Sequence, residues 1–318
     1  MTPAESKVTG SSPFEEGIGP GVAYLGFRLA AWLAEKLPRS VGDAVASAGS
    51  IAWYRLSRGR REVVLRNLTR VVGPRPQIDD MVRRAFISYG EYWLETFRLG
   101  RYTVEDLNRM VDVDEASMKA MHEALDEKRG VLVITPHFGF YDLGSAWMGA
   151  QGWPFSTVTE VLRPRALYEW FTALRSKWGM KVIPAERGQL ARRLGKILAN
   201  GEGLSLVSDR DLGRRGIWAE FFGERTTLPA TPALLMARRN IPVLAGAMYK
   251  SEGRLKVVFE PVAYERTGIE QDDMSSCAQV VATALEGLIR RAPEQWHLFM
   301  TNWPSDEPGL PARGRPDE

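Results

Sequence analysis

The chain has 318 residues, of which 44% are hydrophobic and 25% charged, a composition typical of a globular protein with a large core. Its 42 Lys and Arg residues against 39 Asp and Glu residues give a formal charge of only +3, so the charge gives no support to nucleic-acid binding. A single cysteine, Cys277, excludes an internal disulfide, and with only three histidines no zinc-ligand cluster is recognisable. Cys277 lies in a helix-like stretch, so we expect it to be a small core residue.

The N-terminal part of the chain predicts helices that associate with a membrane surface. Residues 1–16 are polar and contain Pro, Ser and Gly, so a flexible tail is expected there and another at 307–318. No secretory signal is recognisable, and no run of eighteen uncharged apolar residues predicts a membrane-spanning helix. Residues 21–38 have apolar side chains at helical spacing, but Arg28 interrupts them, which favours an amphipathic helix lying in the interface.

Two more helices are expected before the alternation of strands and helices begins. Residues 41–57 predict a helix with Ser40 as its N-cap, which leads into a cluster of six arginines. The six are Arg55, Arg58, Arg60, Arg61, Arg66 and Arg70. Such a cluster is either a solvated helix face or a dock for anionic lipid headgroups, and its place after two apolar helices favours the dock. Residues 81–100 predict a helix whose aromatic face packs in a core or lines an acyl-chain groove. Residues 17–110 are therefore predicted to be a helical, membrane-associating segment.

Residues 111–306 have the alternating pattern of an α/β domain. A charged helix over 112–130, with an exposed His122, precedes apolar runs that alternate with amphipathic stretches. The expected strands cover 131–134, 153–162, 181–188 and 203–211, and the expected helices cover 163–179, 189–201 and 272–289. This alternation predicts a mostly parallel central sheet flanked by helices.

The stretch GVLVITPHFGFYDLGSAW (130–147) carries the first candidate site residues. Its apolar, β-branched run ends at Pro136, because proline has no N–H to continue the ladder of a central strand. His137 follows at the carboxyl end of the strand, where open α/β sheets bind ligands, and Asp142 begins the next helix. This spacing suits a general base and the carboxylate that orients its imidazole, although the same spacing also arises by chance.

A second polar cluster follows the strand expected at 203–211. Asp209 and Asp211 are both candidates for a second carboxylate near His137, and the sequence places them equally well. Acidic residues in loops are also common turn formers. The residues that follow, up to Pro232, contain a Phe-Phe-Gly turn and two prolines and predict a loop over the site.

Four segments in one order resemble a known family. HFGFYD matches the pattern H-x-G-x-[WY]-[DE], and DRDL, FFG and PATPA follow in the second cluster. The segments TEVLRPRALYEWFTALRSKWGMKVIP and APEQWHLFMTNWP complete the set, which covers about residues 20–304. The chain thus resembles the bacterial lysophospholipid acyltransferase superfamily, in the branch of the late lipid A acyltransferases and the actinobacterial phosphatidylinositol mannoside acyltransferases. Pro136, where the family commonly has Asn, is closer to the mannoside branch.

The resemblance implies a glycerolipid-acyltransferase-like core and a catalytic mechanism. His137 would act as general base on an acceptor hydroxyl that attacks a thioester, Asp142 would orient its imidazole, and Asp211 would complete the charge network. The oxyanion would be stabilised by backbone N–H groups after Pro136 or by Arg175. The implied substrate-binding residues are Glu160, Arg175, Asp209, Arg210, Phe222, Gly223 and Pro229.

The resemblance also implies a function. It predicts a peripheral enzyme on the cytoplasmic face of an anionic phospholipid membrane, which transfers a long-chain acyl group to a mannose of a phosphatidylinositol mannoside. Acyl-CoA would be the donor substrate, with no bound cofactor, no metal and no nucleic-acid partner. The alternatives are late acylation of lipid A from acyl carrier protein and a membrane-binding homologue without catalytic activity.

Overall fold

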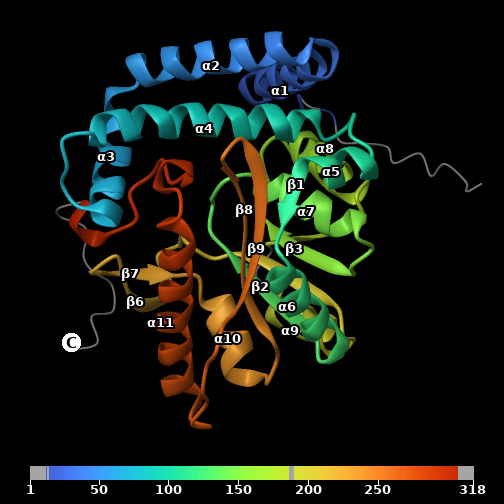
Figure 1. Ribbon diagram of the computed structural model, residues 1–318, viewed down its shortest axis with the longest axis vertical. Helices are drawn as coiled ribbons and strands as arrows, with labels where there is room; N and C mark the ends of the chain where they lie inside the picture. The colour runs from blue at the N-terminus through green and yellow to red at the C-terminus, as the bar shows by residue number, and fades with distance from the viewer. Residues whose placement is uncertain (1–11, 13, 186–189, 307–318) are drawn as a thin grey trace, which may run out of the picture.

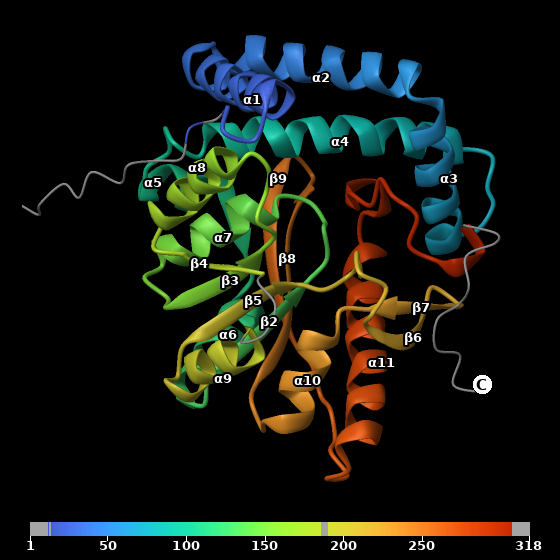
Figure 2. The same ribbon diagram turned by 180° about the vertical axis from the view of Figure 1, so that it is seen from behind.

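A seven-stranded sheet in the order β1-β9-β8-β2-β5-β3-β4 forms the centre of the protein (Figures 1 and 2). The computed structural model describes residues 12, 14–185 and 190–306, so most of both predicted tails lies outside the described residues. Neighbouring strands run parallel except for the antiparallel pair of β8 and β9. The predicted α/β fold with a mostly parallel sheet is therefore confirmed. The strands are β1 (Val111–Val113), β2 (Val131–Thr135), β3 (Phe155–Thr159), β4 (Lys181–Pro184), β5 (Gly203–Val207), β8 (Val243–Ser251) and β9 (Arg254–Pro261).

Helices cover both faces of this sheet, which explains the continuous apolar run of β2. Leu132 and Ile134 pack in a core with α9, α10 and α11, whereas Val131 and Val133 pack on the other face with α5, α6 and α7. Cys277 is buried in the first of these cores, as predicted. The helices around the sheet are α5 (Val104–Met110), α6 (Glu115–Asp126), α7 (Tyr141–Ala150), α8 (Arg165–Ser176), α9 (Leu190–Ala199), α10 (Ala230–Arg238) and α11 (Glu270–Ile289).

The first four helices form a layer of their own against one end of the sheet. Figures 1 and 2 show α4 lying across that end, with α1 and α2 as an outer layer on α4. The predicted N-cap Ser40 is wrong, because α2 begins at Arg39 directly after Pro38. Within the described residues, no helix combines the length and apolarity needed to cross a bilayer. The four helices are α1 (Ile18–Lys36), α2 (Arg39–Leu56), α3 (Arg58–Val72) and α4 (Ile78–Arg98).

A two-stranded hairpin occupies the segment that the sequence predicted as a loop. Strands β6 (Ile217–Phe221) and β7 (Glu224–Leu228) are antiparallel and are joined by Phe222 and Gly223. Both turn residues have positive φ, 53° and 76°, which is the conformation that a two-residue hairpin turn requires. The Phe-Phe-Gly motif is therefore a hairpin turn.

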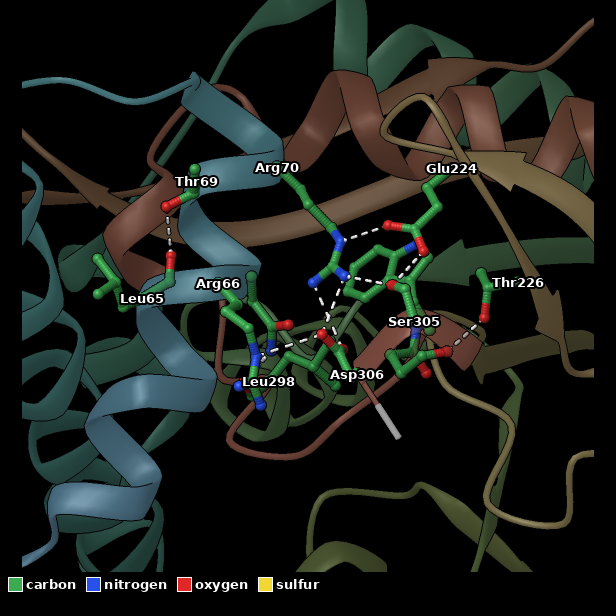
Figure 3. Close-up of polar contacts among 12 residues, drawn as sticks. Leu65, Arg66, Thr69, Arg70, Glu224, Thr226, Leu298, Ser305 and Asp306 are labelled. Atoms are coloured by element: carbon green, nitrogen blue, oxygen red, sulfur yellow. Dashed lines mark hydrogen bonds and ion pairs between the residues drawn. The ribbon is translucent and has the colours of Figure 1, made fainter. Parts of the chain in front are cut away.

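The end of the arginine cluster contacts the C-terminal segment, residues 293–306 (Figure 3). Arg70 of α3 donates to Glu224 at 2.9 Å and to Asp306 at 2.9 Å, and Arg66 lies 3.3 Å from the Asp306 carboxylate. The Asp306 side chain is only 2% exposed, so its charge depends on these partners. The prediction of an open lipid dock is therefore wrong for Arg70, which is 16% exposed and joins α3 to the hairpin and the C-terminal segment. The Arg66 side chain stays 47% exposed beside Asp306.

Candidate active site

A pocket of about 450 Å³ lies at the carboxyl ends of β2, β3 and β5, where α4 closes the end of the sheet. His137 enters it from the segment after β2, and Arg175 enters it from α8. Tyr89 and Trp93 of α4 form part of the wall, which gives the pocket an aromatic side opposite the polar strand ends. The predicted position of the site at the carboxyl edge of the sheet agrees with this geometry.

The strand register brings His137 and Asp209 together. Strands β2 and β5 are parallel neighbours in which Thr135 is paired with Val207, so the residues two positions further on also lie side by side. His137 Nδ1 lies 2.6 Å from Asp209 Oδ1. Because a carboxylate can only accept, Nδ1 carries the proton and Nε2 is left as the basic nitrogen.

Asp209 is a fully buried carboxylate with a donor on each oxygen. Trp296 Nε1 donates to Oδ2 at 2.8 Å, opposite the His137 contact on Oδ1. Burial alone would raise the pKa of the Asp209 carboxyl, but the charge and hydrogen bond of His137, with the Trp296 N–H, hold that pKa below its usual value. Asp209 therefore stays ionised beside the imidazole.

Asp142 has a different partner from the one predicted. Arg175 donates to both Asp142 oxygens, at 2.8 and 3.2 Å, and Tyr92 OH donates to Oδ2 at 2.7 Å. Burial alone would lower the pKa of the Arg175 guanidinium, but the Asp142 carboxylate outweighs burial and the pKa is raised. The prediction that Asp142 orients His137 is therefore wrong, since the first turn of α7 points this carboxylate toward α4 and α8. Asp142 instead holds a cation at the pocket wall.

The backbone after His137 is held tightly and leaves few free donors. Gly139 has φ 60°, and a Cβ built on it would lie 2.1 Å from the Met248 carbonyl oxygen, so no other residue fits there. The N–H groups of Phe138, Gly139 and Phe140 donate to the carbonyls of Pro136, Gln295 and Met248. These three N–H groups are therefore committed to the fold. Arg175, with guanidinium donors beyond those given to Asp142, is the better-placed partner for an oxyanion.

Besides Arg175, three of the predicted binding residues line the pocket as expected. Glu160 follows β3, Arg210 follows β5, and Pro229 precedes α10, and all three line the pocket. An Arg210 nitrogen lies 3.8 Å from the Glu160 carboxylate, so a weak ion pair links two neighbouring strand ends. The partly exposed Arg210 is a cation for an anionic part of a substrate.

Asp211, Phe222 and Gly223 lie away from the pocket lining, and their predicted roles are corrected. Asp211 accepts from the N–H groups of Gly213 and Gly216 and from the Thr227 hydroxyl, so it shapes the loop before the hairpin. Phe222 is buried with its ring 5.6 Å from that of Trp296, and Gly223 completes the hairpin turn. Asp211 is therefore structural because it holds the loop, and Phe222 because its ring packs in the core.

His297 and Trp296 are site residues to which the sequence assigned no role. His297 lines the pocket with its Nε2 3.0 Å from Ser88 Oγ, and burial together with nearby His137 lowers its pKa to about 3. It is therefore a neutral imidazole at physiological pH. The only sequence signal for this pair was the segment APEQWHLFMTNWP in the family resemblance. His122 is exposed on α6, as predicted.

Comparison with known proteins decides the family. The family described as bacterial lipid A biosynthesis acyltransferase matches residues 20–305. The chain belongs to this family. It is 30% identical over 294 residues to a phosphatidylinositol mannoside acyltransferase of Mycolicibacterium smegmatis, covering 91% of this chain and 94% of that protein.

Two more relatives have different degrees of identity to this chain. A phosphatidylinositol mannoside acyltransferase of Mycobacterium tuberculosis is 30% identical over 259 residues, covering 80% of this chain and 81% of the relative. A lipid A biosynthesis lauroyltransferase of Escherichia coli is 22% identical over 298 residues, covering 89% of this chain and 91% of the relative. The resemblance predicted from sequence is confirmed, and the protein is an acyltransferase of the lipid A and phosphatidylinositol mannoside acyltransferase family.

Proposed function

We propose that this acyltransferase moves a long-chain fatty acyl group from acyl-CoA to a mannose hydroxyl of a phosphatidylinositol mannoside. The observation that carries the proposal is the His137–Asp209 pair at 2.6 Å, which leaves a basic Nε2 on a side chain that lines the pocket. The acceptor class is supported by the two mycobacterial relatives, which are 30% identical over most of the chain, against 22% for the lauroyltransferase.

The arrangement supports a direct transfer in which one bond forms and one breaks. His137 Nε2 takes the proton of the acceptor hydroxyl while its oxygen attacks the thioester carbonyl carbon. Arg175, held by Asp142, stabilises the oxyanion, and the ionised Asp209 stabilises the imidazolium. When the C–S bond breaks, the imidazolium returns its proton to the leaving thiolate, so that His137 is neutral for the next cycle.

A second, apolar cavity supports the proposal of a long acyl chain. A groove of about 460 Å³ runs between α1, α2 and α4, and its walls include Ala34, Gly49 and Leu94. Tyr89 and Trp93 of α4 line both this groove and the catalytic pocket. We name it the helical groove, and we propose that the acyl chain passes these two side chains from His137 into it. The aromatic face of α4 would then serve the acyl-groove role that its sequence suggested.

The outer face of α1 supports the proposed attachment to a membrane. Apolar side chains recur there every three or four residues with large exposed fractions, 80% for Ile18, 51% for Leu25 and 57% for Leu29. A contiguous exposed apolar stripe on an amphipathic helix is typical of helices that lie in the headgroup region of a bilayer. We propose that this stripe docks the enzyme peripherally on the cytoplasmic face of the cell membrane.

The double substitution Leu25→Gln and Leu29→Gln should lower the partition coefficient onto anionic vesicles by about tenfold or more, because each buried leucine contributes roughly 1.5–3 kcal/mol. Vesicle flotation measures this directly. Val104 and Ile269 are 48% and 60% exposed outside α1, and their paired replacement by Gln is the matched control. Equal binding by both double variants would contradict docking through α1.

The function is tested by thiol release from palmitoyl-CoA with a phosphatidylinositol mannoside, a lipid A precursor, or no acceptor. We expect mannoside-dependent release that falls about 10²–10⁴-fold in His137→Ala, because that variant lacks the base. His122→Ala, which removes an exposed histidine, should retain full activity.

The other outcomes point to the alternatives. Release only with the lipid A precursor would overturn the acceptor but keep the mechanism. Release without acceptor would identify a thioesterase. Transfer only from acyl carrier protein would overturn the donor, and no transfer from either donor would indicate a catalytically inactive, membrane-binding protein.

A further inference from the structure

The C-terminal segment, residues 293–306, passes directly behind the catalytic histidine. The His137 carbonyl accepts from the His297 N–H at 2.7 Å, and the Gln295 carbonyl accepts from the Gly139 N–H at 2.8 Å. At its far end the segment is joined to α3 through Asp306 and Arg70 (Figure 3). The backbone at His137 and directly after it is thus held by one segment that is distant in sequence.

Trp296 of this segment contacts the carboxylate behind the histidine. Its indole N–H donates to Asp209 Oδ2 at 2.8 Å, and the ring is 2% exposed. It packs against Phe222 and Trp303, with ring centroids 5.6 and 6.2 Å away. The indole therefore cannot turn without moving the core around it.

An indole N–H is suited to hold a catalytic carboxylate, because it donates and cannot accept. A buried charge needs a hydrogen bond on each oxygen, and here His137 and Trp296 supply one each. We propose that Trp296 is a positioning residue, which fixes Asp209 in the orientation that makes Nε2 the basic nitrogen of His137. This inference rests on the proposed role of His137 as the base.

The buried titratable groups beside His137 and Asp209 do not change their protonation state near neutral pH. Burial lowers the pKa of His297 to about 3, and burial with the nearby Asp142 charge raises that of Tyr141 above its usual value. Arg175 donates to both oxygens of Asp142, so these two charges compensate each other beside the pocket. A change in the pH dependence of the enzyme in Trp296→Phe would therefore report on the contact of His137 with Asp209.

The test is Trp296→Phe, which removes the N–H and keeps an aromatic ring. Without this donor the Asp209 charge acts more strongly on His137 and favours the imidazolium. We expect the acid limb of the pH dependence of kcat/KM to move upward by roughly 0.5–1 pH unit, and kcat to fall about tenfold.

Trp303→Phe is a closely matched control. Trp303 lies in the same segment, is 0% exposed, and donates its N–H to the Phe221 carbonyl at 3.2 Å. The Trp303→Phe variant therefore loses the same side-chain volume as Trp296→Phe and also one N–H donor, but that donor does not contact Asp209. Both variants should lose similar thermal stability, but only Trp296→Phe should change the pH profile.

A readout independent of substrate separates this inference from the proposed function. The chain has three histidines, so the imidazole nitrogens of His137 can be assigned by NMR in the free enzyme. We expect its titration midpoint to move upward in Trp296→Phe, because the Asp209 charge then acts more strongly on the imidazole. An unchanged midpoint, as in Trp303→Phe, would overturn the proposal.

If Trp296→Phe does not fold, benzothienylalanine at position 296 answers the same question, because it replaces only the N–H by sulfur. The same upward shift would support the proposal, and a wild-type titration would overturn it.

Discussion

Asp209→Asn is expected to lower kcat for acyl transfer by about 10³–10⁴-fold while the protein remains folded. The reason lies in the two donors around this side chain. Trp296 Nε1–H can only donate, so the amide oxygen of an asparagine would turn toward it. The amide NH₂ would then face His137 Nδ1, which would have to accept. The proton would move to Nε2, and the base would be lost.

Steady-state kinetics with saturating acceptor measures this effect, and Asp211→Asn is its control. Asp211 is two residues further along the same loop, but it accepts from Gly213, Gly216 and Thr227. The kcat of Asp211→Asn should stay within about threefold of wild type, and a lowered melting temperature should be its main effect. A reversed pattern, with Asp211→Asn inactive and Asp209→Asn active, would contradict the assignment of the orienting carboxylate.

Gly49→Leu is expected to lower kcat/KM for palmitoyl-CoA by roughly 10–100-fold and to leave a short-chain donor such as butyryl-CoA unaffected. A Cβ built on Gly49 meets no atom within 4 Å, so a leucine can enter the helical groove without strain. It would displace a few methylenes of the acyl chain, each contributing about 0.8 kcal/mol when buried. Activity against donor chain length measures the effect.

The matched control for this variant is Gly26→Leu on α1. Gly26 is also helical and also leaves open space for a Cβ, but it does not line the groove. Both substitutions replace a helical glycine by a good helix former, so both should raise helix stability by a similar amount. Equal loss with short and long donors in Gly49→Leu, or no loss at all, would show that the acyl chain lies elsewhere.

The parts of the site that were predicted correctly depend on local sequence. The apolar run of β2 ends at Pro136 because proline cannot continue a central strand, and this places His137 at the carboxyl edge of the sheet. The alternation of apolar strands and amphipathic helices likewise predicted the mostly parallel sheet, since such strands must be buried on both faces. Short elements such as β1, β6 and β7 lack a long pattern and were not predicted.

The partner of His137 could not be predicted from spacing along the chain. Asp142 is five residues away, but the start of α7 directs it to Arg175 and Tyr92. Asp209 is 72 residues away in sequence, and its contact arises only because β5 pairs with β2 in the register that matches Val207 to Thr135. Trp296 is farther still and reaches Asp209 through the packing of the C-terminal segment.

The sequence by itself thus determined the fold class, the family and the position of the catalytic histidine, because each follows from residues that are neighbours in the chain. Only the tertiary structure decided which carboxylate orients that histidine, which arginines are exposed, and that Tyr89 and Trp93 of α4 line both the catalytic pocket and the helical groove. These features depend on strand order and helix packing, which bring together side chains whose separation in sequence carries no signal of contact.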